Sequence, residues 1–220
     1  YMQIVLGNKQ KEICEADFGE LIKNSKAKKI EIDLGTGDGR FVYKNAQKNR
    51  DTFYIGIDPI EKQLQKYSKK VIRKKLTNAL FVISSVECLP KELENTANTV
   101  NIFLPWGSLL NYVANCNKDV IKNVKNLLFS NGEINILFGY AHQTEPTETE
   151  RLDLEKLNES YIKEILIPNY EKLSLVCKKM EEISMEKLKK FETSWSKKLS
   201  FGKERPMFFL KFQVEAQKPD

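Results

Sequence analysis

Residues 30–40 read IEIDLGTGDGR, and this stretch decides the fold. Apolar and polar residues alternate up to Asp33, and glycines then occupy every second position, at Gly35, Gly37 and Gly39. The alternation predicts a buried strand, and the glycines predict a turn whose backbone approaches a ligand closely before a helix begins. Dinucleotide-binding turns space their glycines G-x-G-x-x-G, so the spacing found here indicates a different ligand.

The acids that follow the first two predicted strands suit S-adenosylmethionine (SAM). Asp33 can face the ammonium group of this ligand, while Gly35 and Gly37 leave room for it. About twenty residues further on, a second apolar run ends in Asp58, and an acid at this place accepts hydrogen bonds from a ribose diol. Because the glycine turn with Asp33 and the second acid, Asp58, occur together at this separation, they favour a SAM site over an ordinary glycine-rich turn.

The rest of the chain alternates between strand and helix patterns. We expect strands at 29–34, 53–57, 80–84, 99–104, 133–139, 176–183 and 207–214, and a hairpin from 2–6 and 10–14. We expect helices at 18–24, 40–48, 61–74, 108–115, 118–129, 152–164, 169–172 and 185–199, with a break at Pro168 and a loop over 144–151.

This order predicts a single α/β domain over residues 1–220. Its Rossmann-like, mostly parallel sheet has seven strands with helices on both faces. A short N-terminal β-hairpin (residues 1–15) precedes it, and a linker (residues 144–172) joins the fifth and sixth strands. This is the architecture of a class I SAM-dependent methyltransferase.

Composition narrows the class of protein. The four cysteines lack C-x-x-C spacing and His142 is the only histidine, so we predict no disulfide framework, no metal site and no histidine-based triad. No signal peptide and no apolar run of membrane length occurs, which predicts a cytoplasmic protein without a membrane partner. We expect it to be a monomer.

Basic residues gather in two places, and the net charge is +6. Residues 62–75 hold Lys62, Lys66, Lys69, Lys70, Arg73, Lys74 and Lys75 with no acid among them. A second group comprises Lys187, Lys189, Lys190, Lys197, Lys198, Lys203 and Arg205. Two such clusters indicate a polyanionic partner, although a solvated face of a lysine-rich protein gives the same pattern.

Further candidate residues follow the third and fourth strands. Glu87 can accept from an adenine amino group beside the backbone of Val86, or it can be an acid placed at a helix N-terminus. Trp106 lies between a proline and a glycine, where a stacking platform or a core position is expected. Trp195 has polar and basic neighbours, which suits an unstacked nucleobase as well as partial burial.

Four blocks together resemble the aminoglycoside-resistance 16S rRNA (adenine-N1)-methyltransferases, which modify adenine 1408 of the decoding site. They are residues 32–40 with 53–59 (DLGTGDGR within the first, FYIGIDP as the second), 80–90, 103–110 (FLPWGSLL) and 194–202 (SWSKKLSFG). They span nearly the whole chain in the family's order and are more specific than a generic SAM motif.

The resemblance implies that Trp106 and Trp195 hold a flipped adenine of 16S rRNA in the assembled 30S subunit, with Pro105 near the reacting atoms. The residues expected to bind SAM, and S-adenosylhomocysteine as product, are Asp33, Gly35, Thr36, Gly37, Asp58, Pro59, Ser85, Val86, Glu87, Leu104, Ser108 and Thr193. The residues expected to bind RNA are Lys66, Lys69, Lys70, Arg73, Lys74, Arg151, Lys197, Lys198, Lys203 and Arg205.

Two other functions fit parts of the pattern. A tRNA (guanine-N7)-methyltransferase shares the SAM-binding half, but a longer D-P-W signature and more acids are expected of it. A non-catalytic ribosome-binding factor with a methyltransferase fold is the other alternative, and the intact Asp33, Gly35, Gly37 and Asp58 argue against it.

Overall fold

The structure is a computed structural model that describes residues 1–188, 191, 193 and 205–215. The first elements in chain order are β1 (Met2–Leu6), β2 (Lys9–Ile13), α1 (Glu15–Ser25), β3 (Lys29–Leu34), α2 (Arg40–Lys48), β4 (Thr52–Asp58), α3 (Glu61–Arg73), β5 (Ala79–Ile83), η1 (Val86–Cys88), η2 (Lys91–Leu93) and β6 (Ala97–Phe103). They are followed by α4 (Gly107–Ala114), α5 (Lys118–Asn126), β7 (Leu128–Gly139), α6 (Pro146–Arg151), α7 (Glu159–Tyr161), the π-helical η3 (Ile162–Leu166), α8 (Ile167–Glu171), β8 (Leu175–Glu182), α9 (Met185–Leu188) and β9 (Met207–Val214).

The strands of the described residues form one nine-stranded sheet in the order β2-β1-β5-β4-β3-β6-β7-β9-β8. The five strands from β5 to β7 are parallel, and β9 and β8 join antiparallel. The seven predicted strands are therefore present, but the expected separate hairpin belongs to the same sheet. It joins because Ile4 of β1 pairs antiparallel with Val82 of β5, which covers an edge that would otherwise be open.

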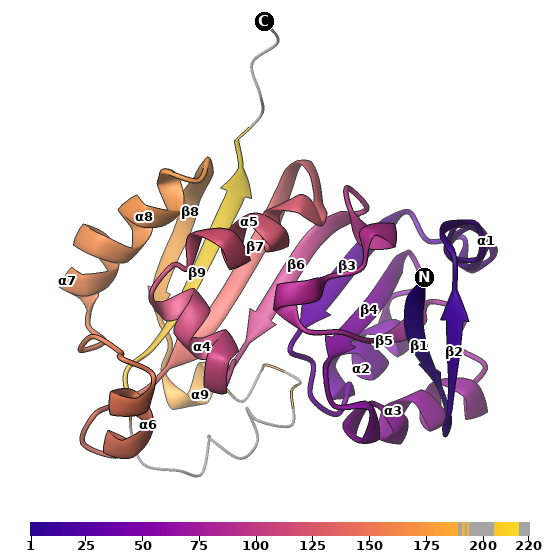
Figure 1. Ribbon diagram of the computed structural model, residues 1–220, viewed down its shortest axis with the longest axis horizontal. Helices are drawn as coiled ribbons and strands as arrows, with labels where there is room; N and C mark the ends of the chain where they lie inside the picture. The colour runs from indigo at the N-terminus through magenta and orange to yellow at the C-terminus, as the bar shows by residue number, and fades with distance from the viewer. Residues whose placement is uncertain (189–190, 192, 194–204, 216–220) are drawn as a thin grey trace, which may run out of the picture.

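Two apolar layers enclose the sheet. On one face, α4 and α5 pack their buried side chains against β3, β6 and β7, and these helices lie in front of the sheet in Figure 1. On the other face, α2 and α3 form a smaller core with Tyr54 and Phe81 of the sheet. The faces separate because side chains alternate along each strand, as Tyr54 between Phe53 and Ile55 illustrates.

The glycine loop lies where the strand order reverses. From β3 the chain continues to β4 on one side, whereas β6 lies on the other side of β3. In open α/β sheets the crevice at such a point, beyond the carboxyl ends of the strands, takes the ligand. Gly35 and Gly39 have φ of 75° and 78°, and a Cβ on Gly39 would meet the Phe81 ring at 2.3 Å. Glycine is therefore required for the loop to close over β5.

Several predicted boundaries are wrong, most of them between β7 and β8. Residues 146–151 form α6 instead of a loop, and residues 152–158 are not helical. Pro168 does not break the helical segment, which runs from α7 through the π-helix into α8. A proline removes one donor and crowds the carbonyl four residues back, and the wider π turn before it relieves this crowding.

Two boundary errors lie elsewhere. The helix predicted to reach residue 129 ends at Asn126, and β7 begins at Leu128, whereas the strand was expected to begin at residue 133. Of the helix predicted at 185–199, the structure describes α9, Phe191 and Thr193, and the rest lies outside the described residues.

The segment between β7 and β8 is fastened to the C-terminal end of α4. Tyr161 Oη donates to the carbonyl of Ala114 (2.9 Å), and Tyr170 Oη donates to that of Val113 (2.9 Å). Two more bonds run from Asn111 Nδ2 to the Leu152 carbonyl (2.5 Å) and from Asn115 Nδ2 to the Asp153 carbonyl (3.1 Å). The last carbonyls of a helix lack partners within the helix, so the segment satisfies groups that would otherwise be unpaired.

Tyr170→Phe tests this fastening. Tyr170 has an exposed fraction of 0% and its ring stacks on Phe212 at 4.4 Å, a contact that phenylalanine retains. The variant leaves the buried Val113 carbonyl without its donor, so we expect the free energy of unfolding in urea to fall by about 1–3 kcal/mol. Tyr1→Phe, at an exposed ring, is the control and should change little. Equal stability of Tyr170→Phe and the unaltered protein would refute the role of this bond.

Candidate functional site

A buried carboxylate stands at the end of β3. Asp33 is 4% exposed, and Thr36 Oγ1 donates to its Oδ2 at 2.5 Å. The pKa of Asp33 is raised to about 7, mainly by burial; the charges of Glu31 and Asp58 add to the rise, and the Thr36 bond opposes it. A carboxylate in this position is stabilised by a cation, such as the ammonium group of SAM.

Asp58 connects the end of β4 to the glycine loop. Its Oδ2 accepts from the backbone N–H of Gly37 (2.9 Å), and its Oδ1 accepts from that of Ile60 (2.9 Å). Burial raises the pKa of Asp58, while these two bonds lower it. Each carboxylate oxygen can accept a second bond, so Asp58 can hold the loop and still receive a ribose diol.

Two adjoining clefts open around these carboxylates, with volumes of about 300 Å³ and about 370 Å³. The first is lined by Leu34, Gly35, Gly37, Ile57, Asp58, Pro59, Ile60, Gln63, Ser84, Ser85, Val86, Glu87, Leu104, Pro105, Trp106, Ser108 and Leu109. The second is lined by Asp33, Gly35, Thr36, Gly37, Asp38, Lys62, Gln63, Lys66, Phe103 and Thr193. All residues predicted to bind the cofactor therefore line one cleft or the other.

Sequence reasoning missed some lining residues. Gln63 lines both clefts from the first turn of α3, and Phe103 lines the second from the end of β6. Gln63 follows Asp58 by five residues and lies in the first turn of the next helix, and this position is a signal that could have identified it.

Glu87 lies in η1 at the outer side of the first cleft and is exposed. A hydrogen bond from the Ser85 hydroxyl lowers the pKa of Glu87, and bonds from its own backbone and from Tyr112 add to this. Glu87 is therefore a charged acceptor at neutral pH, as the binding of an adenine amino group requires.

Trp106 stands at the rim of the first cleft with 46% of its surface exposed. It caps the N-terminus of α4 between two residues of positive φ, Leu104 (53°) and Gly107 (58°). This turn carries Trp106 out of the core, while Pro105 beside it is buried. This exposure excludes the core position that the sequence left open, and the stacking role of Trp106 stays a prediction.

The predicted RNA-binding residues are distributed unevenly. Lys69 and Arg73 of α3 and Lys74 directly after it are exposed, and Lys70 lies over the ring of Tyr67 at 4.5 Å. Lys66 pairs with Asp38 (2.8 Å), and this hydrogen bond raises the pKa of Lys66. Lys66 thus lies both on the basic face of α3 and in the second cleft.

Two predicted RNA-binding arginines are paired within the protein. Arg151 contacts Glu148 of the same helix at 2.7 Å. Arg205 contacts Glu145 at 2.5 Å, and the two side chains are only 12% and 15% exposed. The Arg205 pair connects the residues before β9 to those before α6. The remaining candidates, Trp195, Lys197, Lys198 and Lys203, lie outside the described residues.

Two classes of feature are absent from the described part of the chain. It holds no cluster of three or more side chains that could bind a metal ion. None of its helices is long and apolar enough to cross a membrane.

Comparisons with known proteins agree with this geometry. The family model described as "NpmA: 16S rRNA (adenine(1408)-N(1))-methyltransferase" matches residues 3–214. A 16S rRNA (adenine(1408)-N(1))-methyltransferase of Escherichia coli is 35% identical over 212 residues, which cover 94% of this chain and 96% of that protein.

Two solved structures match this chain over nearly its full length. A 30S ribosomal A1408 methyltransferase from an uncultured bacterium is 40% identical with a TM-score of 0.77, over 98% of this chain and all of that one. A variant 16S rRNA (adenine(1408)-N(1))-methyltransferase from Catenulisporales acidiphilia, solved with its cosubstrate SAM, is 21% identical with a TM-score of 0.87 over the full length of both chains, and it supports the fold.

The alternative family fits less of the chain. A tRNA (guanine-N(7)-)-methyltransferase of Bacillus cytotoxicus is 30% identical, but the match covers 61% of this chain. The full-length match, the class I methyltransferase fold and the composition of the two clefts agree with one another. The chain belongs to the 16S rRNA (adenine(1408)-N(1))-methyltransferase family.

Proposed function

We propose that this protein methylates N1 of adenine 1408 in the 16S rRNA of the 30S subunit with SAM, and thereby confers resistance to aminoglycosides. The observation that carries the proposal is the convergence of every predicted cofactor residue on two adjoining clefts, with an exposed tryptophan at their rim. We also propose that it acts as a monomer in the cytoplasm, where its ribosomal substrate lies.

The residues of the clefts fit SAM by their chemistry. Asp33 offers a buried carboxylate to an ammonium group, Asp58 has free lone pairs for a diol, and Glu87 offers a charged acceptor to an adenine. Bound SAM supplies an electrophilic methyl group on its sulfonium sulfur. The open glycine loop between Asp33 and Asp58 lets the ligand lie close to the backbone.

The reaction requires positioning more than proton transfer. N1 of adenine has an available lone pair at neutral pH, so no side chain has to remove a proton before attack. The base has to leave its stack and be held in line with the methyl group. Trp106 supports the base by stacking, and its indole face stabilises the positive charge that the purine acquires.

The basic face of α3 suits the phosphates that surround the target base. Its exposed cations adjoin the second cleft through Lys66, so a strand bound along the helix can reach the glycine loop. Contacts of this kind supply affinity and steering without reading sequence.

A reverse-transcription stop assay tests the proposed function. Purified 30S subunits incubated with the protein and SAM should give a new stop next to adenine 1408, because an N1-methyl group blocks base pairing. Trp106→Ala should reduce the rate by about 100-fold or more because the base is no longer held in line, while SAM affinity stays within about threefold.

Other outcomes of this assay redirect or refute the assignment. Intact SAM binding without a stop at 1408 contradicts the proposed substrate and favours another RNA. Neither a stop nor SAM binding would favour the non-catalytic ribosome-binding factor. Weakened SAM binding in Trp106→Ala would contradict the role given to that residue.

The raised pKa of Asp33 predicts how the stability of the SAM-free protein depends on pH. Its folded-state pKa, raised to about 7, lies above that of the unfolded chain, so its contribution to stability is complete at low pH and is lost as the pH rises through about 7. We expect this group to lower Tm as the pH rises from about 4 to about 7, and Asp33→Asn to make this fall smaller. Identical pH profiles for the two proteins would contradict the raised pKa.

A further inference from the structure

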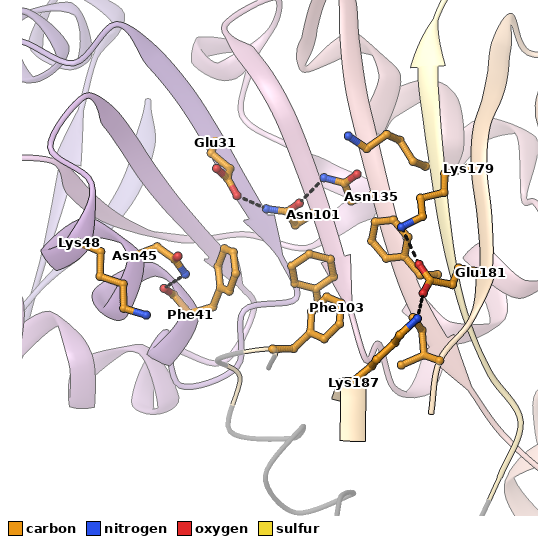
Figure 2. A pocket seen from close by; sticks show the side chains of 14 residues that line it. Glu31, Phe41, Asn45, Lys48, Asn101, Phe103, Asn135, Lys179, Glu181 and Lys187 are labelled. Carbon is orange, nitrogen blue, oxygen red and sulfur yellow. Dashed lines mark hydrogen bonds and ion pairs between the residues drawn. The ribbon is translucent and has the colours of Figure 1, made fainter. Parts of the chain in front are cut away.

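A third hollow lies on the sheet face that carries α2, and no assigned function uses it. Its volume is about 620 Å³, and it runs between α2 and α9, as Figure 2 shows. It shares Phe103 with the second cofactor cleft. We call it the Asn101 groove, after the residue at the middle of its floor.

The floor is a row of polar side chains across adjacent strands. Asn101 stands opposite Asn135, which stands opposite Lys211. Asn101 Nδ2 donates to Glu31 Oε1, and Asn135 Nδ2 donates to Asn101 Oδ1 at 2.9 Å (Figure 2). Asn135 Oδ1 is buried and, among the described residues, has no partner. Buried polar atoms normally have partners, so a small turn of this amide toward a ligand donor is favourable.

One wall of the groove is aromatic. Phe103 makes edge-to-face contacts with Phe41 and Phe191, each with ring centroids 5.3 Å apart, and Phe191 lies 6.3 Å from Phe209. These rings come from α2, β6, the residues after α9, and β9, and all four line the groove. A row of rings beside a floor of amides suits a flat heterocycle that carries donors and acceptors.

The groove carries positive charge. Its lining includes Lys48, Lys179, Lys187 and Lys211, and two carboxylates, Glu31 and Glu181. Lys211 is paired with Glu133, which lies outside the lining, at 2.9 Å. Burial raises the pKa of Glu31, and Glu181 is shared by Lys179 (2.6 Å) and Lys187. One carboxylate between two ammonium groups leaves an excess of positive charge. This charge repels a polycation such as an aminoglycoside and attracts an anion.

We propose that the Asn101 groove binds one nucleotide, with the base against the phenylalanine wall and the asparagine floor and the phosphate at Lys179 and Lys187, the two ammonium groups that share Glu181 (Figure 2). The same chemistry is offered by a nucleotide of rRNA and by a free mononucleotide. In the first case the groove extends the proposed function, on which it then rests, and in the second it is independent of it. The shared Phe103 places the bound nucleotide next to the cofactor cleft.

Calorimetric titration with AMP and UMP tests the free form. SAM is present at saturation so that adenosine does not enter the cofactor clefts. The double variant Lys179→Ala/Lys187→Ala alters two exposed side chains and should weaken binding by about tenfold or more. Asn135→Leu should weaken it as well. The double variant Lys91→Ala/Lys122→Ala removes the same charge from exposed positions outside the groove and should bind within about twofold of the unaltered protein.

Affinity for 30S subunits tests the rRNA form with the same variants. If mononucleotides do not bind but the groove variants weaken 30S binding by about tenfold while the control does not, the nucleotide belongs to rRNA. The proposal is overturned if neither binding responds to the groove variants, or if the control weakens binding equally. Failure of the proposed function would appear separately, as unaltered protein that gives no stop at adenine 1408.

Discussion

The buried carboxylate of Asp33 is the interaction on which the site depends. It lies at the end of a central strand with two further carboxylates, those of Glu31 and Asp58, close enough to raise its pKa. Removing a charged group from water is costly unless an opposite charge compensates it. Within the described cleft the group is paired with a hydroxyl, that of Thr36, and not with a cation. A cationic ligand bound beside Asp33 would stabilise its charged form.

The rest of the fold places groups around that carboxylate. The reversal of strand order beside β3 opens the crevice, and Asp58 fixes the glycine loop across it. On the far side, Trp106 directly precedes α4, whose C-terminal end is fastened by Tyr161 and Tyr170. The inserted segment between β7 and β8 thus holds the helix that follows Trp106, although it does not line the two described clefts.

Every residue that local sequence patterns assigned to the cofactor lines one of the two clefts, because strand ends and glycine turns are specified by neighbouring residues. The patterns failed where distant residues meet. The pairing of Ile4 with Val82 adds the hairpin to the sheet, and it cannot be predicted from the residues around either position. The row containing Asn101 and Asn135 arises only when strand registers are aligned, so the groove was missed. The helical segment continues through Pro168 with a π-helical stretch before it, and no residue pattern predicts such a stretch.

The most direct test of this account is the number of protons released when SAM binds. Calorimetry at pH 7 in phosphate and in Tris, whose ionisation enthalpies differ, measures this number. If Asp33 titrates near pH 7 and receives the ammonium group, about half a proton should be released per SAM bound, and Asp33→Asn should abolish the release. Equal binding enthalpies in the two buffers would show that Asp33 is already ionised and would contradict the account.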